Sequence, residues 1–147
     1  MGKKAEDQII SQAGVIPYRI RSDGSLQVLL ITSRVGAWIV PKGKIDEGHT
    51  AHEAARIEAL EEAGVVGIGG SPEGEPLGHY EYEKLGSKHR VDLYAMPVLR
   101  VLEDWPDRDH RRREWMSVDE AIRRVEYPDL RDVLERMERF DRSSGAA

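Results

Sequence analysis

Residues 43–65 read GKIDEGHTAHEAARIEALEEAGV, and this stretch decides the fold. Thr50 and Glu53 have the spacing of a capping box, which predicts that a helix begins at Thr50. The residues that follow are mostly Ala, Glu and Leu, which favour helices. Gly64 stands where a glycine commonly ends a helix. The stretch therefore predicts a glycine-bearing loop followed by a helix over residues 50–63.

Three glutamates of this helix, Glu58, Glu61 and Glu62, are spaced i, i+3 and i+4. An α-helix places such positions side by side on one face. Three like charges repel one another there, and no lysine or arginine lies four residues after any of them. A divalent cation such as Mg²⁺, which prefers carboxylate oxygens, would relieve the repulsion. The alternative is a solvated acidic face, which the three glutamates alone do not exclude.

The residues on either side of this stretch predict alternating strands and helices. The dipeptide Asp23-Gly24 separates two apolar runs, residues 13–20 and 26–32, as in a β-hairpin. Further strands are predicted over residues 37–40, 65–68, 77–83, 90–102 and 114–116, and helices over 117–125 and 128–140. We expect one α/β domain over residues 11–140, with a flexible N-terminus (1–10) and a flexible tail (141–147).

The bulk composition narrows the class of protein. The chain has 147 residues, a net charge of −5 and no cysteine, which excludes disulfides and thiolate metal sites. No apolar run approaches the ~20 residues that span a bilayer. We therefore expect a cytoplasmic protein with no membrane partner and no stable nucleic-acid complex. Basic clusters at residues 88–90 and 110–113 favour a small anionic ligand; solvated loops are the alternative.

Residues 43–65 resemble the Nudix box, G-x5-E-x7-R-E-U-x-E-E-x-G-U, in which U is aliphatic. The matching positions are Gly43, Glu58, Glu61, Glu62, Gly64 and Val65. The resemblance implies a Nudix fold, an α/β/α sandwich with a mixed β-sheet and the box helix. It implies Mg²⁺, or Mn²⁺ in its place, held by Glu58, Glu62 and the Gly43 carbonyl. It also implies that Glu61 is the general base, although the roles of Glu61 and Glu62 are interchangeable at this stage.

Two positions depart from the family pattern. His49 stands in place of the first box glutamate, and Ile57 in place of the arginine before Glu58. In the family, that glutamate and arginine support the site around the metal ligands. Arg56 precedes the position of the box arginine by one residue, which places it about 100° away round the helix. It is therefore no obvious substitute for that arginine. We therefore expect the reaction class to be kept and the supporting contacts to differ.

The wider chain resembles the branch of diphosphoinositol polyphosphate phosphohydrolases. The matching pieces are residues 28–34, 38–41, 61–65, 88–90, 101–105 and 111–115. The resemblance implies cleavage of a diphosphate in an inositol pyrophosphate or a dinucleoside polyphosphate, and Pro41-Lys42-Gly43 looks like the dinucleoside polyphosphate hydrolases. It implies a set of substrate-binding residues: Thr32, Ser33, Arg34, Lys42, Lys88, His89, Arg90, Arg111 and Arg113.

Other functions stay open from the sequence. One alternative is hydrolysis of another nucleoside diphosphate-linked substrate. Another is a non-catalytic Nudix-fold ligand sensor, although such modules usually lose the metal glutamates, which this chain keeps. The partner expected in each case is an anionic polyphosphate small molecule, bound by a monomer or a homodimer.

Overall fold

The two longest strands of the sheet, β1 (Ile9–Ile20) and β7 (Ser87–Val101), lie side by side and run parallel. The computed structural model describes residues 8–69, 72 and 74–143. Ile9 and Ile10, expected in the flexible N-terminus, already pair with Lys88 and His89 of β7. The strand therefore begins two residues before the predicted domain boundary, while residues 1–7 and 144–147 of the predicted flexible ends lie outside the described part.

The first hairpin is confirmed. β1 pairs antiparallel with β2 (Leu26–Thr32), and Tyr18 lies opposite Val28. Gly24 has a φ of 86°, which glycine adopts without steric cost. Asp23 accepts a hydrogen bond from the Ser25 amide at 2.9 Å, as short polar side chains do in turns.

The remaining strands extend the sheet on both sides, in the order β3-β2-β1-β7-β5, with β4 on β1, β6 on β7 and β8 on β2. Because β1 and β7 are parallel while the other pairs are antiparallel, the sheet is mixed, as expected. One segment expected in a loop forms the short strand β4. The bounds are β3 (Trp38–Ile39), β4 (Lys42–Lys44), β5 (Val65–Gly67), β6 (Gly78–Lys84) and β8 (Arg113–Met116).

The box helix begins where the capping box predicts. α1 (Ala51–Glu58) starts after Thr50, whose hydroxyl accepts from the Glu53 amide at 3.1 Å. Its end differs from the prediction, because the α-helix continues as a π-helical turn, η2 (Ala59–Ala63). Gly64 then ends it in the left-handed conformation, at a φ of 65°. Single π-helical turns of this kind occur frequently at functional sites.

Two helices follow β8. α2 (Val118–Arg124) is capped by Ser117, and α3 (Pro128–Glu135) begins with a proline in its first turn. The last part of the helix predicted over 128–140 is instead a 3₁₀ turn, η3 (Arg136–Phe140). Met137 stays buried in that turn, so the same apolar pattern serves both conformations.

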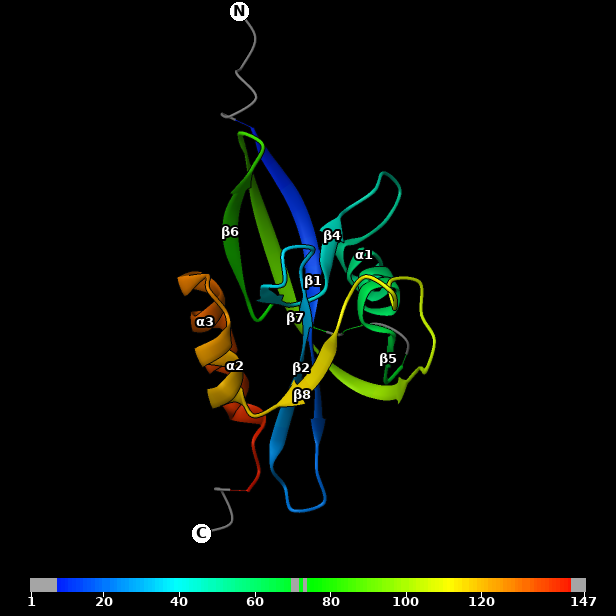
Figure 1. The fold of residues 1–147 in the computed structure, drawn as a ribbon, viewed down its shortest axis with the longest axis vertical. Coiled ribbons are helices and arrows are strands. Elements are labelled where there is room, and N and C mark those ends of the chain that lie inside the picture. Colours follow the sequence, from blue (N-terminus) through cyan, green and yellow to red (C-terminus); the bar gives the residue numbers. More distant parts are fainter. Residues whose placement is uncertain (1–7, 70–71, 73, 144–147) are drawn as a thin grey trace, which may run out of the picture.

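The helices cover both faces of the sheet (Figure 1). α1 and η2 pack their alanines against one face, together with Val15 and Ile31. α2 and α3 pack on the other face, over Leu30 and Val91. This is the expected α/β/α sandwich. In the described part of the chain, no helix is long and apolar enough to cross a membrane.

Candidate functional site

The site is built around Glu58, the last residue of α1. Gly43 of β4 lies opposite Ala13 of β1, on the side of the sheet that α1 covers. A Cβ atom at Gly43 would overlap the Glu58 carboxyl group, so the close approach of helix and strand requires glycine there. The structure thus brings Gly43 and Glu58, two of the predicted metal ligands, into contact.

Glu61 and Glu62 lie in the π-helical turn and have different surroundings. Glu62 is only 8% exposed, whereas Glu61 is exposed. The Lys42 amide donates to Glu62 Oε1 at 2.9 Å, and Arg111 Nη2 donates to Oε2 at 2.9 Å. Glu62 is therefore held in one orientation. Among the described residues, no group donates a hydrogen bond to the Glu61 carboxylate, which is exposed.

The local charge favours a cation. Burial, and then the charges of Glu62 and Glu61, raises the pKa of the Glu58 carboxyl to about 7. Burial also raises the pKa of Glu62, despite the hydrogen bonds from Lys42 and Arg111. Within the described part of the chain, no three acidic or histidine side chains converge as a metal cage. Mg²⁺ commonly uses one or two carboxylates and takes its other ligands from water and substrate phosphates, so Glu58 and Glu62 fit it.

These pKa values predict how the stability of the metal-free protein depends on pH. The folded-state pKa of Glu58, about 7, lies above its ordinary value of 4.5, so the fold favours the neutral carboxyl. The stability that the fold gains from the neutral Glu58 carboxyl is fully present below pH 4.5 and is lost as the pH rises through about 7. We expect Glu58→Gln to remove most of this loss in urea unfolding between pH 5 and 8 with EDTA present. Parallel pH curves for the two proteins would contradict the raised pKa.

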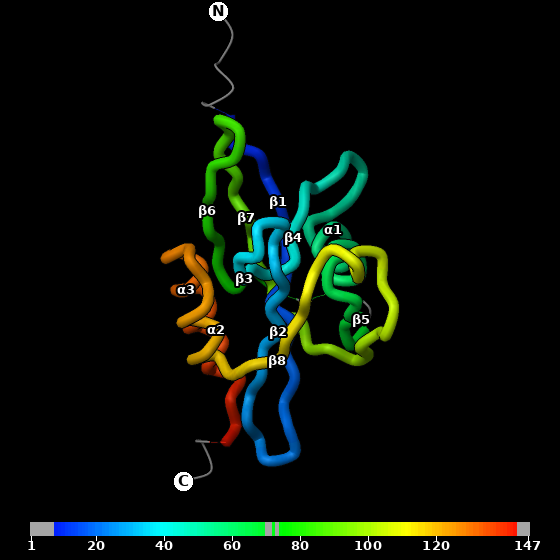
Figure 2. The backbone as a smooth tube through the Cα atoms, in the orientation of Figure 1, coloured from blue at the N-terminus to red at the C-terminus, as the bar shows by residue number. Residues whose placement is uncertain are grey.

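The segment after β7, residues 102–112, lies beside the end of the box helix (Figure 2) and is hydrogen-bonded to it. The Asp107 amide donates to the Glu61 carbonyl at 3.0 Å, and Trp105 Nε1 donates to the Glu62 carbonyl at 3.1 Å. Arg113 donates to the Ala63 carbonyl at 2.9 Å. The last carbonyls of a helix have no partner within the helix, and this segment supplies partners for them.

Arg113, predicted to bind substrate, makes several contacts with the protein itself. Its guanidinium also donates to the Leu102 carbonyl and stacks 3.8 Å from the centre of the Trp105 ring. Gly64 makes room for this stack, since a Cβ there would overlap both side chains. Arg113 thus joins the segment after β7 to the box helix, and we leave it out of the proposed substrate site.

Removing the Arg113 side chain is therefore expected to act on stability. Charged hydrogen bonds to carbonyls contribute about 2 kcal/mol, so we expect Arg113→Ala to lower the free energy of unfolding by at least that amount. Arg112→Ala is the matched control, because Arg112 is exposed and its guanidinium lies 5.7 Å from the Trp38 ring. Chemical denaturation measures both. An Arg113→Ala protein of unchanged stability and a raised KM would restore substrate binding as its role.

Arg111 and Thr32 also make structural contacts. Arg111 Nη1 donates to the Thr32 carbonyl at 3.0 Å, and Nε donates to Asp107 at 2.9 Å. The Thr32 hydroxyl accepts from the Arg112 amide at 2.9 Å. Thr32, predicted to bind substrate, is buried, so the geometry makes it a support for Arg111.

A cavity of about 400 Å³ lies beside these residues. Four residues from the predicted substrate set line it, namely Ser33, Arg34, Lys42 and Arg111. Tyr82 and Tyr127 line it as well, with ring centroids 6.1 Å apart. Lys84 adds a positive charge, while Glu83 and Glu126 add negative charges. The cavity thus combines cations with aromatic surface next to the glutamates.

The predicted cluster Lys88-His89-Arg90 does not act as a unit. Successive residues of a strand point to opposite faces, so His89 lies on one face of β7 and its two neighbours on the other. The His89 ring stacks on Tyr82, 4.8 Å between centroids, next to the cavity. Arg90 instead lies 3.5 Å from Asp92. His89 thus lies next to the cavity lining through Tyr82, and Lys88 lies opposite Glu83, which also lines the cavity.

Several residues of the site were not singled out from the sequence. Tyr82 lies within the strand predicted over residues 77–83, and Tyr127 and Lys84 belong to no motif. Asp107 and Trp105 do not line the cavity, but they donate hydrogen bonds to the carbonyls at the end of the box helix. Residues 101–105, one of the pieces that resemble the phosphohydrolase branch, include Trp105 and mark this segment in the sequence.

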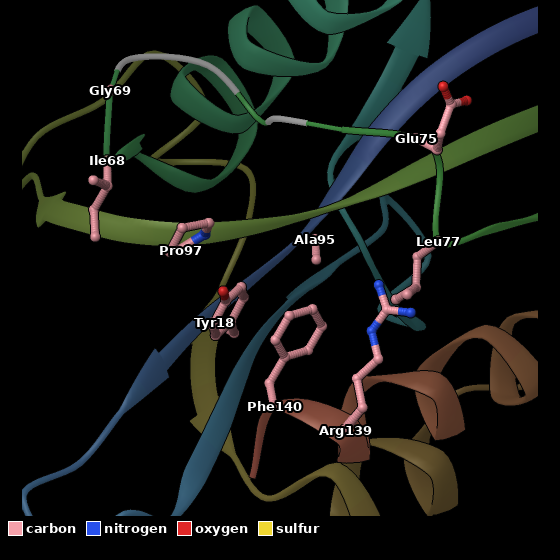
Figure 3. A pocket seen from close by; sticks show the side chains of 9 residues that line it. All are labelled: Tyr18, Ile68, Gly69, Glu75, Leu77, Ala95, Pro97, Arg139 and Phe140. Carbon is pink, nitrogen blue, oxygen red and sulfur yellow. The ribbon is translucent and has the colours of Figure 1, made fainter. Parts of the chain in front are cut away.

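A second cavity, of about 350 Å³, lies between the end of β7 and η3 (Figure 3). The Tyr18 ring stacks on Phe140 there, 4.9 Å between centroids. Of its nine lining residues only Glu75 and Arg139 are charged, and none belongs to the predicted site. The cavity lined by Arg111, which donates to Glu62, is therefore the candidate reaction site.

Known proteins are similar to this chain in fold and in sequence. Crystal structures of an Ap4A hydrolase from C. elegans match it, one with a TM-score of 0.67 and 22% identity over 90% of this chain and 98% of that chain. Nudix hydrolase 16, mitochondrial, of Arabidopsis thaliana is 33% identical and covers 90% of this chain and 81% of the relative. Diphosphoinositol polyphosphate phosphohydrolase 3-beta of Bos taurus is 38% identical, over 70% of this chain and 56% of the relative.

The family follows from the match along the chain. A NUDIX domain profile matches residues 11–137, which span the whole described sheet except the start of β1, and all but the last turn of the helices. Together with the 33% identity to a Nudix hydrolase over most of both chains, this match is decisive. The chain belongs to the Nudix hydrolase family.

Proposed function

We propose that this protein is a Mg²⁺-dependent hydrolase of the phosphoanhydride bond in dinucleoside polyphosphates. The observation that carries the proposal is the cavity in which two tyrosine rings lie together with several cations, one of which, Arg111, donates to Glu62. Nucleobases stack on aromatic side chains, and phosphates pair with cations. The likeness to the Ap4A hydrolase establishes the fold alone, but the aromatic and cationic lining of this cavity suits the bases and phosphates of the substrate named there.

In the proposed mechanism, Glu58 and Glu62, with the Gly43 carbonyl, would hold Mg²⁺. A metal held there would neutralise the charge that develops on the phosphate oxygens as water attacks and the phosphoanhydride bond breaks, releasing the other phosphate as the leaving group. Glu61, exposed beside them, accepts a proton from the attacking water. Lys42 and Arg34 bind and orient the polyphosphate from the cavity wall. Burial lowers the pKa of Lys42. The negative charge of Glu62 opposes this shift, and the positive charges of Arg111 and Lys84 add to it.

Diphosphoinositol polyphosphate is the second candidate substrate, favoured by the 38% identity to the Bos taurus phosphohydrolase. A highly phosphorylated inositol needs many cations and no base-stacking surface. Here Glu83 and Glu126 line the cavity and Arg113 is engaged elsewhere. These features favour the dinucleoside substrate.

Substitution of the two tyrosines separates the candidates. Loss of one base–aromatic stack costs ~1–3 kcal/mol, so we expect Tyr127→Leu to raise KM for a dinucleoside tetraphosphate roughly tenfold. Tyr82→Phe keeps the ring and should change KM little. Neither variant should affect cleavage of a diphosphoinositol polyphosphate. Tyr18→Leu, in the second cavity, is the control, and steady-state kinetics measures all three.

A preference of the enzyme for diphosphoinositol polyphosphate over the dinucleoside polyphosphate would contradict the proposed substrate. It would appear as faster cleavage of the diphosphoinositol polyphosphate by the wild-type protein, with Tyr127→Leu changing neither reaction. Binding of either compound without turnover in Mg²⁺ would instead favour a ligand sensor.

A further inference from the structure

Arg111 occupies a particular position in the site. Its side chain is 13% exposed, and each of its three guanidinium nitrogens donates a hydrogen bond within the protein. The acceptors are the carboxylates of Glu62 and Asp107 and the carbonyl of Thr32, at 2.9, 2.9 and 3.0 Å. Such a planar group with three fixed acceptors has one orientation. Arg111 lines the cavity, and three of its five N–H donors are directed at these protein acceptors.

Arg111 holds Glu62, whose orientation matters for the proposed metal site. Glu62 follows the general base and is one of the two carboxylates assigned to the metal. Its other oxygen accepts from the Lys42 amide, so Arg111 fixes the remaining degree of freedom of the carboxylate. Carboxylates that ligate metals are themselves held by hydrogen bonds, and loss of such a partner costs 10–100-fold in affinity or activity, as a rough range.

The usual support is missing at two positions. Ile57 has no polar side-chain atom, and His49, exposed in the loop before α1, makes no side-chain hydrogen bond to another described residue. The segment that carries Arg111 is instead fastened to the helix through Asp107 and Trp105, which bond the carbonyls of Glu61 and Glu62. The contacts that hold the end of the box helix thus come from residues 102–112.

We propose that Arg111, oriented by Asp107, is a positioning residue for Glu62 that takes over the supporting role of the absent box glutamate and arginine. The proposal rests on the proposed metal site. It differs from the role predicted for Arg111 in the sequence, because the arginine then acts on the metal site in the absence of any substrate.

The test is Mn²⁺ binding to the substrate-free full chain, followed by electron paramagnetic resonance. We expect Arg111→Ala to weaken Mn²⁺ binding at least ~10-fold. Arg111→Lys should weaken it comparably, because an ammonium keeps the charge but cannot make three fixed contacts. Asp107→Ala should act in the same direction, and the double variant should be no weaker than Arg111→Ala. Arg108→Ala is the control, since Arg108 is exposed in the same segment and, among the residues that the structure describes, forms an ion pair with Asp104 alone.

Introducing His49→Glu and Ile57→Arg into the Arg111→Ala protein tests the replacement directly. Recovery of Mn²⁺ affinity supports the proposal, and no recovery contradicts the claim of replacement. If Arg111→Ala does not fold by circular dichroism, Arg111→Lys and Asp107→Ala carry the same comparison.

Two outcomes separate this inference from the proposed function. Wild-type Mn²⁺ affinity in both Arg111 variants, with KM rising as substrates gain phosphates, would make Arg111 a substrate ligand and overturn the inference. In that case Glu58→Gln would still lose Mn²⁺ and the proposed function would stand. Unchanged Mn²⁺ affinity in Glu58→Gln would instead remove the proposed metal site.

Discussion

Replacing Glu61 by Gln is expected to lower kcat at least ~100-fold while leaving Mn²⁺ affinity nearly unchanged. Glu61 is exposed beside Glu58, and no described residue occupies its carboxylate, so its proposed task is proton transfer from water. An amide cannot accept that proton. Steady-state hydrolysis together with Mn²⁺ titration separates the two effects.

The same substitution at Glu62 should give a different pattern. Both Glu62 oxygens accept hydrogen bonds, from the Lys42 amide and from Arg111, and the amide nitrogen of glutamine would face one of these donors. We therefore expect Glu62→Gln to lower both Mn²⁺ affinity and kcat. Glu47→Gln, exposed in the loop before α1, is the control. Unchanged rates in both Glu61→Gln and Glu62→Gln would remove the mechanism.

Gly43→Ala is expected to lower kcat/KM about 100-fold. The added methyl group overlaps the Glu58 carboxyl, so either β4 or the Glu58 side chain must move. A displacement of about 1 Å in a catalytic arrangement can cost ~10²-fold in rate. Lys44→Ala is the matched control, because Lys44 is exposed at the end of the same strand.

The expected loss in Gly43→Ala should appear with little change in melting temperature, because the overlap is confined to the site. Kinetics and thermal denaturation on the same preparations check both parts. Wild-type kcat/KM in Gly43→Ala would mean that Glu58 does not act from the position it occupies here.

Local signals predicted the box helix and the first hairpin correctly. The Thr50 capping box and Gly64 fix the two ends of the helical segment, and Gly24 fixes the turn, because each depends on a few neighbouring residues. The π-helical turn was not predictable in this way. Ala59–Ala63 has an ordinary helical composition, and the turn coincides with contacts from Trp105 and Arg113, far along the chain.

The parallel pairing of β1 with β7 was also beyond sequence reasoning, since more than sixty residues separate the partners Ile9 and Lys88. The same limit applies to the cations. Arg111 and Arg113 looked alike in sequence, and only the fold reveals which acceptors surround each guanidinium. The glutamate spacing identified the site because those residues lie on one short helical segment.

Hydrolysis of a dinucleoside tetraphosphate with Mg²⁺ and after addition of EDTA, in wild type and in Glu58→Gln, tests the central claim most directly. We expect turnover by the wild-type protein in Mg²⁺, loss of turnover in EDTA and recovery on adding Mg²⁺ back. Glu58→Gln should be at least ~100-fold slower at the same Mg²⁺ concentration. Equal turnover by the two proteins, or turnover that persists in EDTA, would contradict a metal-dependent hydrolase built on Glu58.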